Sequence, residues 1–248
     1  MSRNIVIGPP GTGKTTFLKN KVDKIIKEGK ASPKEIGYFS FTVKAAEEIR
    51  NRVTNEAWSE AELKKMFPYF CTLHSLAYKC LRLEAHEIMD ELDYMELSDM
   101  TGRKFVNKMK KGNGMDISMP TAQSHYQDTI NLAYAKYPND KDRLQKVFRE
   151  VKLSDFGARS TIMQMDKDLT NFKRDRHKLE YVDYFNSFLE MKNPPYLKYL
   201  FIDEAQDLSA HQWMVVDMIQ YIAQPIETYV AGDDDQAIFR WAGADIEH

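Results

Sequence analysis

Cysteine is scarce in this chain, and so are the other features that mark secreted or membrane-bound proteins. Its 248 residues include two cysteines, Cys71 and Cys80, which have neither the spacing of metal ligands nor the pattern of a disulfide framework. No apolar run reaches the roughly 18 residues of a membrane-spanning helix, and no signal-peptide pattern precedes the first apolar segment. We therefore expect a soluble, intracellular protein of the cytoplasm with no membrane partner.

A dominant charge of one sign is also missing, because 35 Lys and Arg residues stand against 37 Asp and Glu residues. The distribution is nevertheless uneven. Residues 101–178 hold 17 basic and 9 acidic side chains, a net charge of +8. The rest of the chain therefore holds 18 basic and 28 acidic side chains, a net charge of −10. Two interpretations remain open. In the first, the basic stretch contacts a nucleic-acid backbone, and the candidate residues are Lys173, Arg174 and Arg176. In the second, it is a solvated surface whose charge imbalance arose by chance.

The chain does contain a glycine-rich phosphate-binding pattern, in the stretch NIVIGPPGTGKTTFLKN near its start. A strand is predicted before it, over Asn4–Ile7, and a helix after it, over about Lys14–Glu28. Glycines let consecutive backbone N–H groups point at one phosphate, and the helix N-terminus adds partial positive charge. In this pattern the lysine reaches the β- and γ-phosphates and the next hydroxyl ligates Mg²⁺. A nucleoside triphosphate is therefore predicted to bind Gly8, Pro9, Pro10, Gly11, Thr12, Gly13, Lys14, Thr15 and Thr16.

Short runs of β-branched and aromatic residues alternate with helical patterns at both ends of the chain. Further strands are predicted over 35–42, 69–74, 196–203 and 227–233, and further helices over 43–53 and from about 209. This alternation predicts an α/β fold, a parallel sheet with helices on both faces. Between about Glu84 and Lys178 the pattern is helical with little strand signal, so a mainly helical insertion is expected there.

The second nucleotide motif is the apolar strand YLFID, which ends in Asp203 and is followed by Glu204. The carboxyl ends of parallel strands form the edge at which α/β sheets bind ligands. We therefore predict that Asp203 holds Mg²⁺, directly or through water, and that Glu204 polarises the attacking water.

A third segment, YVAGDDDQAIFRWAGAD, places three aspartates and Gln236 at the end of another strand. Adjacent carboxylates repel one another, so such a cluster indicates a nearby cation or a function. Gln236 can donate and accept hydrogen bonds and so sense the γ-phosphate or its water, and Trp241 offers a stacking face for a base. On these grounds alone, a turn followed by core aromatic residues explains the segment equally well.

Taken in order, these segments resemble the motifs of the UvrD/Rep-type superfamily 1 DNA helicases. The stretch GPPGTGKT resembles motif I, FSFTVKAAEEIRNRV motif Ia, TLHSLA motif Ib, LEYVDYFNSFL the acidic-aromatic segment before motif II, FIDEAQDLS motif II, and GDDDQAIFRWAGAD motif III. The last of these is the most specific, since AAA+ ATPases normally follow their Asp-Glu strand with a sensor Asn or Thr.

The resemblance implies a RecA-like P-loop NTPase domain, 1A, formed by residues 1–84 together with 179–248, and a basic helical insertion similar to domain 1B at 85–178. It implies a 3′-to-5′ DNA helicase or translocase driven by ATP and Mg²⁺, with Lys14, Glu204 and Gln236 catalytic and Thr15 and Asp203 at the metal. The implied partners are single-stranded DNA, duplex junctions and a second RecA-like domain expected outside this chain. The residues that match positions contacting single-stranded DNA are Phe41, Thr42, Thr72, His74 and Trp241.

The sequence also departs from the family pattern. The Gln that reads the adenine edge ahead of the phosphate loop has no counterpart, Val43 stands where Asn is usual, and Ala242 stands where Arg is frequent. Alternative functions are a non-motor P-loop ATP-binding regulatory module and an AAA+-type ATPase or small-molecule kinase. For His74, a structural role in the core competes with a DNA contact.

Overall fold

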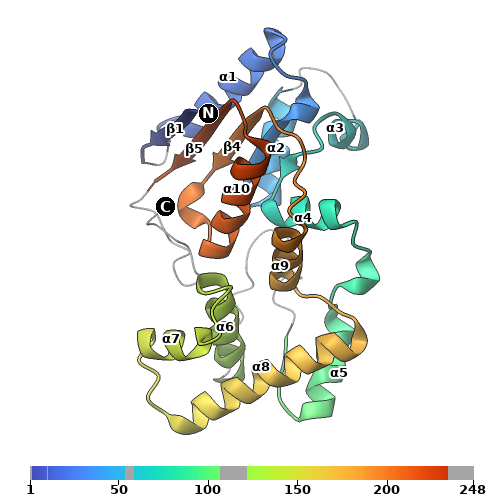
Figure 1. Cartoon of the computed structure of the whole chain (residues 1–248), viewed down its shortest axis with the longest axis vertical. Coiled ribbons are helices and arrows are strands. Elements are labelled where there is room, and N and C mark those ends of the chain that lie inside the picture. Colours follow the sequence, from blue (N-terminus) through green and yellow to red (C-terminus); the bar gives the residue numbers. More distant parts are fainter. Residues whose placement is uncertain (1, 10, 54–58, 107–121, 234–248) are drawn as a thin grey trace.

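The computed structural model describes residues 2–9, 11–53, 59–106 and 122–233, and it contains a five-stranded parallel sheet (Figure 1). The strand order is β1-β5-β4-β2-β3. The strands are β1 (Ser2–Ile7), β2 (Ile36–Ser40), β3 (Phe70–Cys71), β4 (Tyr199–Asp203) and β5 (Glu227–Gly232). Because all five run in the same direction, the carboxyl ends that carry the predicted nucleotide motifs lie along one edge. The predicted α/β class and parallel sheet are confirmed.

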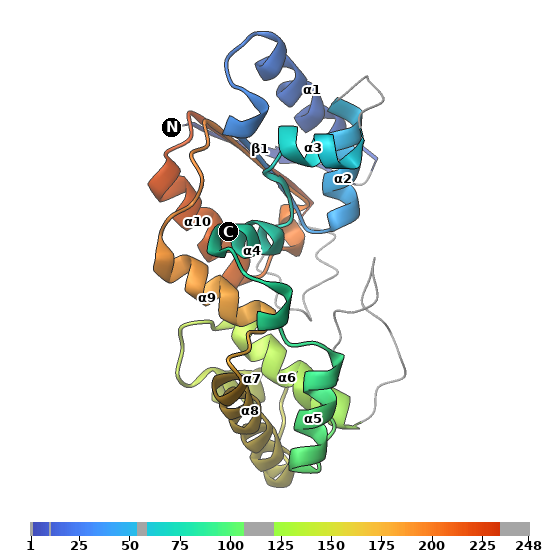
Figure 2. The ribbon, with the colours of Figure 1, turned by 90° about the vertical axis from the view of Figure 1, so that its right-hand side faces the viewer.

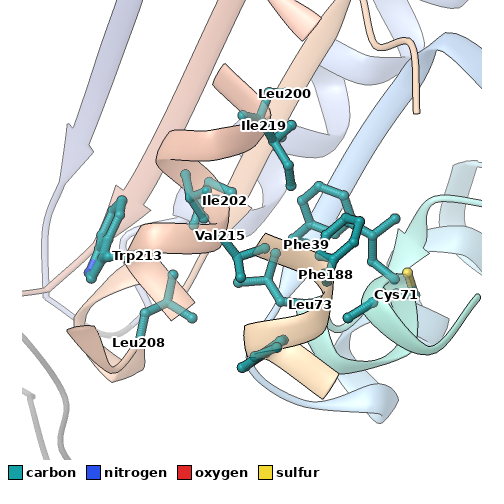
Figure 3. Packing of buried hydrophobic residues seen from close by; sticks show 14 of the residues in the cluster. Phe39, Cys71, Leu73, Phe188, Leu200, Ile202, Leu208, Trp213, Val215 and Ile219 are labelled. Atoms are coloured by element: carbon teal, nitrogen blue, oxygen red, sulfur yellow. The ribbon is translucent and has the colours of Figure 1, made fainter. Parts of the chain in front are cut away.

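Helices cover both faces of the sheet, as the alternating pattern predicts. One face carries α1 (Lys14–Lys27), α2 (Val43–Val53) and α3 (Glu60–Met66), and the other carries α4 (Leu73–Leu81), α9 (Tyr181–Met191) and α10 (Ala210–Ala223) (Figures 1 and 2). Consecutive strand residues point to opposite faces, so Tyr38 packs with the α1 side. Its neighbour Phe39 packs with the α10 side, in the cluster that Figure 3 shows. Full burial of such a side chain contributes about 1.5–3 kcal/mol.

The middle of the chain forms a separate group of helices at one end of the molecule (Figures 1 and 2). These are α5 (Glu91–Thr101), α6 (Ala122–Lys136), α7 (Arg143–Glu150) and α8 (Phe156–Arg176). They enclose their own apolar cluster, which includes Leu97, Ile130, Phe148 and Met165. We call this set the helical insertion. In the described part of the chain, no helix combines the length and the apolar character needed to cross a membrane.

The chain enters and leaves the helical insertion at neighbouring points. Ile88 and Leu179 form a parallel bridge, in which the N–H of Leu179 donates to the carbonyl of Glu87 at 2.8 Å and the N–H of Met89 donates to the carbonyl of Leu179 at 3.0 Å. The predicted limits of the insertion, at 84/85 and 178/179, lie beside this bridge. They remain a prediction.

The strand expected over residues 69–74 is wrong beyond Cys71, because Thr72 begins a helix instead. Its Oγ1 accepts the N–H of Ser75 at 3.1 Å, the hydrogen bond of a helix cap, and its carbonyl accepts the N–H of Leu76 at 3.0 Å. His74 therefore lies in the first turn of α4. Short polar side chains favour such caps, and this local bond outweighed the β-propensity of the neighbouring residues.

Candidate active site

The phosphate loop joins the end of β1 to the start of α1, as its pattern predicts. Gly11 and Gly13 have φ angles of 75° and 84°, a left-handed conformation that other residues adopt only with strain. The carbonyl of Gly13 accepts the N–H of Phe17 at 2.8 Å, and Oγ1 of Thr12 donates to the carbonyl of Pro9 at 2.7 Å. The loop is thus closed on itself and leads directly into a helix N-terminus, which favours bound anions.

Lys14 is the first residue of α1, and its ammonium group folds back over the loop. Its Nζ donates to the carbonyl oxygen of Gly8 and, at 3.1 Å, to that of Pro9. A phosphate oxygen is a stronger partner for a cation than a neutral carbonyl. Lys14 is therefore placed where an incoming triphosphate would exchange these carbonyls for charged oxygens.

Thr15 and Asp203 are 188 residues apart in sequence and adjacent in space, with Oγ1 of Thr15 donating to Oδ2 of Asp203 at 3.1 Å. The same Oδ2 accepts the hydroxyl of Tyr38 at 2.7 Å, and Oδ1 accepts the N–H of Glu204 at 3.1 Å. Asp203 is 2% exposed, and this burial raises the pKa of its carboxyl, although the hydrogen bond from Tyr38 works against the rise. The fold thus brings the two predicted metal ligands together.

These donors suit Mg²⁺ held jointly by protein and nucleotide. Mg²⁺ binds oxygen ligands, and the Thr15 hydroxyl and the Asp203 carboxylate would both be available to hold it, since their oxygens lie 3.1 Å apart. Ser40 lies opposite Asp203 in the strand register, and its buried Oγ makes no hydrogen bond within the described residues, so a bound polar ligand or water would satisfy it. The described ranges hold no cluster of three or more His, Cys, Asp or Glu side chains suited to a metal. One carboxylate, one hydroxyl and phosphate oxygens are the kind of oxygen ligands that Mg²⁺ prefers.

Glu204 adopts a left-handed backbone conformation with φ of 54° and precedes the short helix η3 (Ala205–Asp207). For a residue other than glycine this conformation costs on the order of 1–3 kcal/mol, and such strain is concentrated at functional sites. Nearby Asp207 is half-buried, and burial together with the charge of Glu204 raises its pKa to about 6. The position of Glu204 beside Asp203 suits the predicted role in polarising water, which stays a prediction.

Gln206 is a site residue that sequence reasoning missed. Its Nε2 donates to Oε2 of Glu204 at 2.7 Å, and its Oε1 accepts the N–H of Asp233 at 3.0 Å. A Cβ atom added at Gly232 would lie 3.0 Å from Gln206 Oε1, so glycine lets the amide approach the end of β5. The only signal in the sequence was an amide two residues after the acid, and Tyr38 gave no signal at all.

Four of the five residues predicted to contact single-stranded DNA lie in the described ranges, all just after β2 or β3. Thr42 is exposed and caps α2, accepting the N–H of Ala45 at 3.2 Å. Phe41 is partly buried and packs against the apolar cluster that α4, α9 and α10 share with the sheet. Thr72 is 7% exposed and its hydroxyl caps α4. These residues share the sheet edge that carries the nucleotide motifs, and their DNA contacts stay predictions.

His74 lies within an aromatic group contributed by α9. Its ring stacks on Phe185 with 4.2 Å between centroids and meets Tyr181 and Tyr184 edge-on. Burial lowers the pKa of His74 to about 4, with a smaller contribution from nearby His211, so the imidazole is neutral at pH 7. The ring therefore has a structural role, and any contact it makes with DNA is that of a neutral group.

Thr16 is exposed in the first turn of α1. Three further predicted residues, Pro10, Gln236 and Trp241, lie outside the described residues. Their roles stay predictions on the sequence alone.

The basic candidates at the end of α8 differ in their surroundings. Lys173 is 9% exposed, and its Nζ binds Oε2 of Glu180 at 3.0 Å and Oδ2 of Asp183 at 2.8 Å. Burial alone would lower the pKa of Lys173, but the two carboxylates raise it. The interpretation of Lys173 as a phosphate contact is therefore wrong, because the cation is buried and neutralised. Arg174 and Arg176 are exposed, and each pairs with a carboxylate, Asp175 and Glu96 respectively.

A parallel sheet whose first strand leads through a phosphate loop into a helix, with Thr15 against the aspartate of a second strand, defines a RecA-like P-loop nucleotide-binding domain. The model of the UvrD/REP helicase N-terminal domain matches residues 1–248, and the chain belongs to that helicase family, a family of enzymes. Similar relatives are the ATP-dependent DNA helicases PcrA of Staphylococcus epidermidis, 25% identical, and of Staphylococcus aureus, 24% identical. Each match covers 98% of this chain and 33% of the relative, so the chain spans about a third of the length of these relatives.

Proposed function

We propose that this chain is the ATP- and single-stranded-DNA-binding N-terminal part of a DNA helicase or translocase. In the full-length protein, ATP hydrolysis would drive movement along one strand in the 3′-to-5′ direction. The observation that carries the proposal is the contact of Thr15 with Asp203 beside the phosphate loop. Family membership argues against the AAA+-type alternative. No feature of the described ranges favours a purely regulatory ATP-binding module.

The proposed roles are supported by the positions of the described side chains and, for Gln236, by the family pattern in the sequence. The loop amides and Lys14 bind the phosphates, and Thr15 and Asp203 hold Mg²⁺. When bound, Mg²⁺ neutralises the charge that develops on the phosphate oxygens. Glu204 lies next to Asp203 at the same sheet edge, where it can orient and polarise the attacking water. Gln236 would report the state of the γ-phosphate to residues that contact DNA.

We further propose that a second RecA-like domain of the full-length protein closes on this site and that duplex junctions are bound beside the helical insertion. The relatives are about three times as long as this chain, which supports a further domain. An arginine supplied across such a cleft commonly contributes about 10³–10⁵ in rate. Residues 1–248 should therefore bind nucleotide, hydrolyse it feebly and unwind nothing.

Calorimetric titration with ATP and MgCl₂ tests the nucleotide site. Lys14→Ala should abolish detectable binding, because it removes the main cation facing the phosphates. Lys24→Ala is the matched control, since Lys24 is an exposed lysine of the same helix that pairs with Glu28. Normal binding by Lys14→Ala would show that the loop assignment is wrong.

Phosphate release and strand displacement test the motor role, with and without single-stranded DNA, on residues 1–248 and on the full-length protein. We expect DNA-stimulated ATP turnover only from the full-length protein and not from residues 1–248. Strong DNA stimulation or unwinding by residues 1–248 would contradict the proposal that hydrolysis and unwinding require a second domain.

A further inference from the structure

Tyr38 is a buried tyrosine whose hydroxyl reaches the metal-binding carboxylate of the predicted active site. It lies in the middle of β2 and is fully buried. Strand alternation places it on the α1 face, the face from which Asp203 meets Thr15. Its hydroxyl lies 2.7 Å from Oδ2 of Asp203, although the two residues are 165 positions apart in sequence.

The ring of Tyr38 is fixed by its neighbours in the sheet. It stacks on Phe70 at 5.6 Å and on Phe201 at 6.0 Å between ring centroids, with interplanar angles of 21° and 18°. These contacts hold the aromatic ring whether or not it carries a hydroxyl. The hydroxyl itself makes its hydrogen bond, within the described residues, to Asp203. The ring of Tyr38 thus packs in the core, while its hydroxyl donates a hydrogen bond to the Asp203 carboxylate.

We propose that Tyr38 is a positioning residue for the proposed nucleotide site, where its hydroxyl orients the Asp203 carboxylate for the metal. The inference rests on the proposed function, since it assigns Asp203 to Mg²⁺. Side chains that hydrogen-bond a metal-binding carboxylate typically change metal affinity by about 10- to 100-fold when they are removed. Tyr38 occupies that position in this chain.

The hydrogen bonds around Asp203 explain how this positioning works. Oδ2 receives two hydroxyl donors, from Tyr38 and Thr15, while Oδ1 receives the backbone N–H of Glu204. Together they fix the rotation of the carboxylate. A hydroxyl has one proton and two lone pairs, so Thr15 can donate to Asp203 and still offer oxygen to the metal. When the Tyr38 hydroxyl is removed, the Asp203 carboxylate remains at the end of β4 but loses one of the three hydrogen-bond donors that set its orientation.

Binding of ADP measured by calorimetry, first in EDTA and then at increasing MgCl₂, tests the role. Tyr38→Phe retains the stacked ring and removes only the hydroxyl. We expect unchanged ADP affinity in EDTA and a 10- to 100-fold increase in the MgCl₂ needed to reach the high-affinity state. Tyr229→Phe is the control, because Tyr229 also stacks on Phe201, at 4.9 Å, while its hydroxyl binds Glu227. That control should respond to MgCl₂ as the unmodified protein does.

The same titration in an Asp203→Asn background separates positioning from a general loss of structure. If Tyr38 acts through the carboxylate, adding Tyr38→Phe there produces no further shift. An equal shift in both backgrounds, or no shift in the single variant, would overturn the role of Tyr38. Failure of the unmodified protein to bind ADP in a MgCl₂-dependent way would instead overturn the proposed function.

Discussion

The side-chain amide of Gln206 donates a hydrogen bond to the Glu204 carboxylate at 2.7 Å. The opposite end of this amide accepts the N–H of Asp233 at 3.0 Å, so one side chain links the predicted water-polarising acid to the end of β5. In sequence, the segment after Asp233 carries Gln236 and Trp241, the residues predicted to sense nucleotide and DNA. Gln206 therefore links Glu204 to Asp233, the last described residue before the segment that is predicted to sense nucleotide and DNA.

Gln206→Leu should lower kcat of the full-length protein on the order of tenfold, because loss of a charge-assisted hydrogen bond frees the Glu204 carboxylate. Stimulation by single-stranded DNA should fall with it, while nucleotide affinity stays close to that of the unmodified protein. Steady-state phosphate release, with and without DNA, measures both effects. Gln145→Leu, at an exposed position of α7, is the control. An unchanged kcat and an unchanged DNA response would refute the link.

Glu204→Gln should separate binding from hydrolysis. The replacement keeps an oxygen that can accept the hydrogen bond from Gln206, so the local structure should persist. Assistance by a general base is worth roughly 10²–10⁴-fold in rate, and this factor should be lost. Calorimetry with ATP should give an affinity near the unmodified value, and single-turnover phosphate release should slow accordingly. Hydrolysis at the normal rate would remove Glu204 from the mechanism.

Stability should fall at acidic pH in part through His74. Burial lowers the pKa of His74 to about 4, whereas the ordinary value is about 6.5. As the pH falls below about 6.5, His74 becomes protonated in the unfolded chain but stays neutral in the folded chain. The free energy of unfolding therefore decreases until about pH 4, where His74 is protonated in the folded chain as well. In His74→Phe this contribution is absent and stacking on Phe185 is retained.

Urea denaturation at several pH values measures the effect of His74→Phe. The difference in unfolding free energy between the variant and the unmodified protein should move in favour of the variant as the pH falls. Each unit of pKa difference is worth at most about 1.4 kcal/mol. A difference that does not depend on pH between about 7 and 4 would contradict the assignment.

Lys173→Met should destabilise the fold by about 3 kcal/mol, because it leaves Glu180 and Asp183 without their buried cation. Urea denaturation measures the loss. Arg174→Ala, at an exposed position of the same helix, should change the free energy of unfolding by less than about 0.5 kcal/mol. Equal effects of the two substitutions would mean that the ion pairs of Lys173 contribute no more than a surface contact.

The features predicted from sequence are those that short patterns specify. The phosphate loop, the strand ending in Asp203 and the alternation of strands with helices each depend on neighbouring residues, and the structure contains them. The contact of Thr15 with Asp203 was predictable as well, because parallel strands with these motifs end at one edge. The prediction that Thr72 lies in a strand was wrong because its hydroxyl can also cap a helix, and the sequence pattern is compatible with both conformations.

The residues that escaped prediction depend on long-range packing. Tyr38 resembles any core aromatic residue until the register of β2 and β4 brings its hydroxyl to Asp203. Lys173 resembles any surface lysine until α9 places two carboxylates around it. In each case the partner lies on another element, and a one-dimensional pattern contains no information about that distance.

The bridge between Ile88 and Leu179 limits how the helical insertion can be exchanged. The two segments run in the same direction, so a tight hairpin cannot connect them, and any replacement must be a crossover of about a dozen residues or more. A protein engineer could therefore swap these helices for another crossover of matching ends, whereas trimming them to a short turn would break the pairing where the chain returns to the sheet.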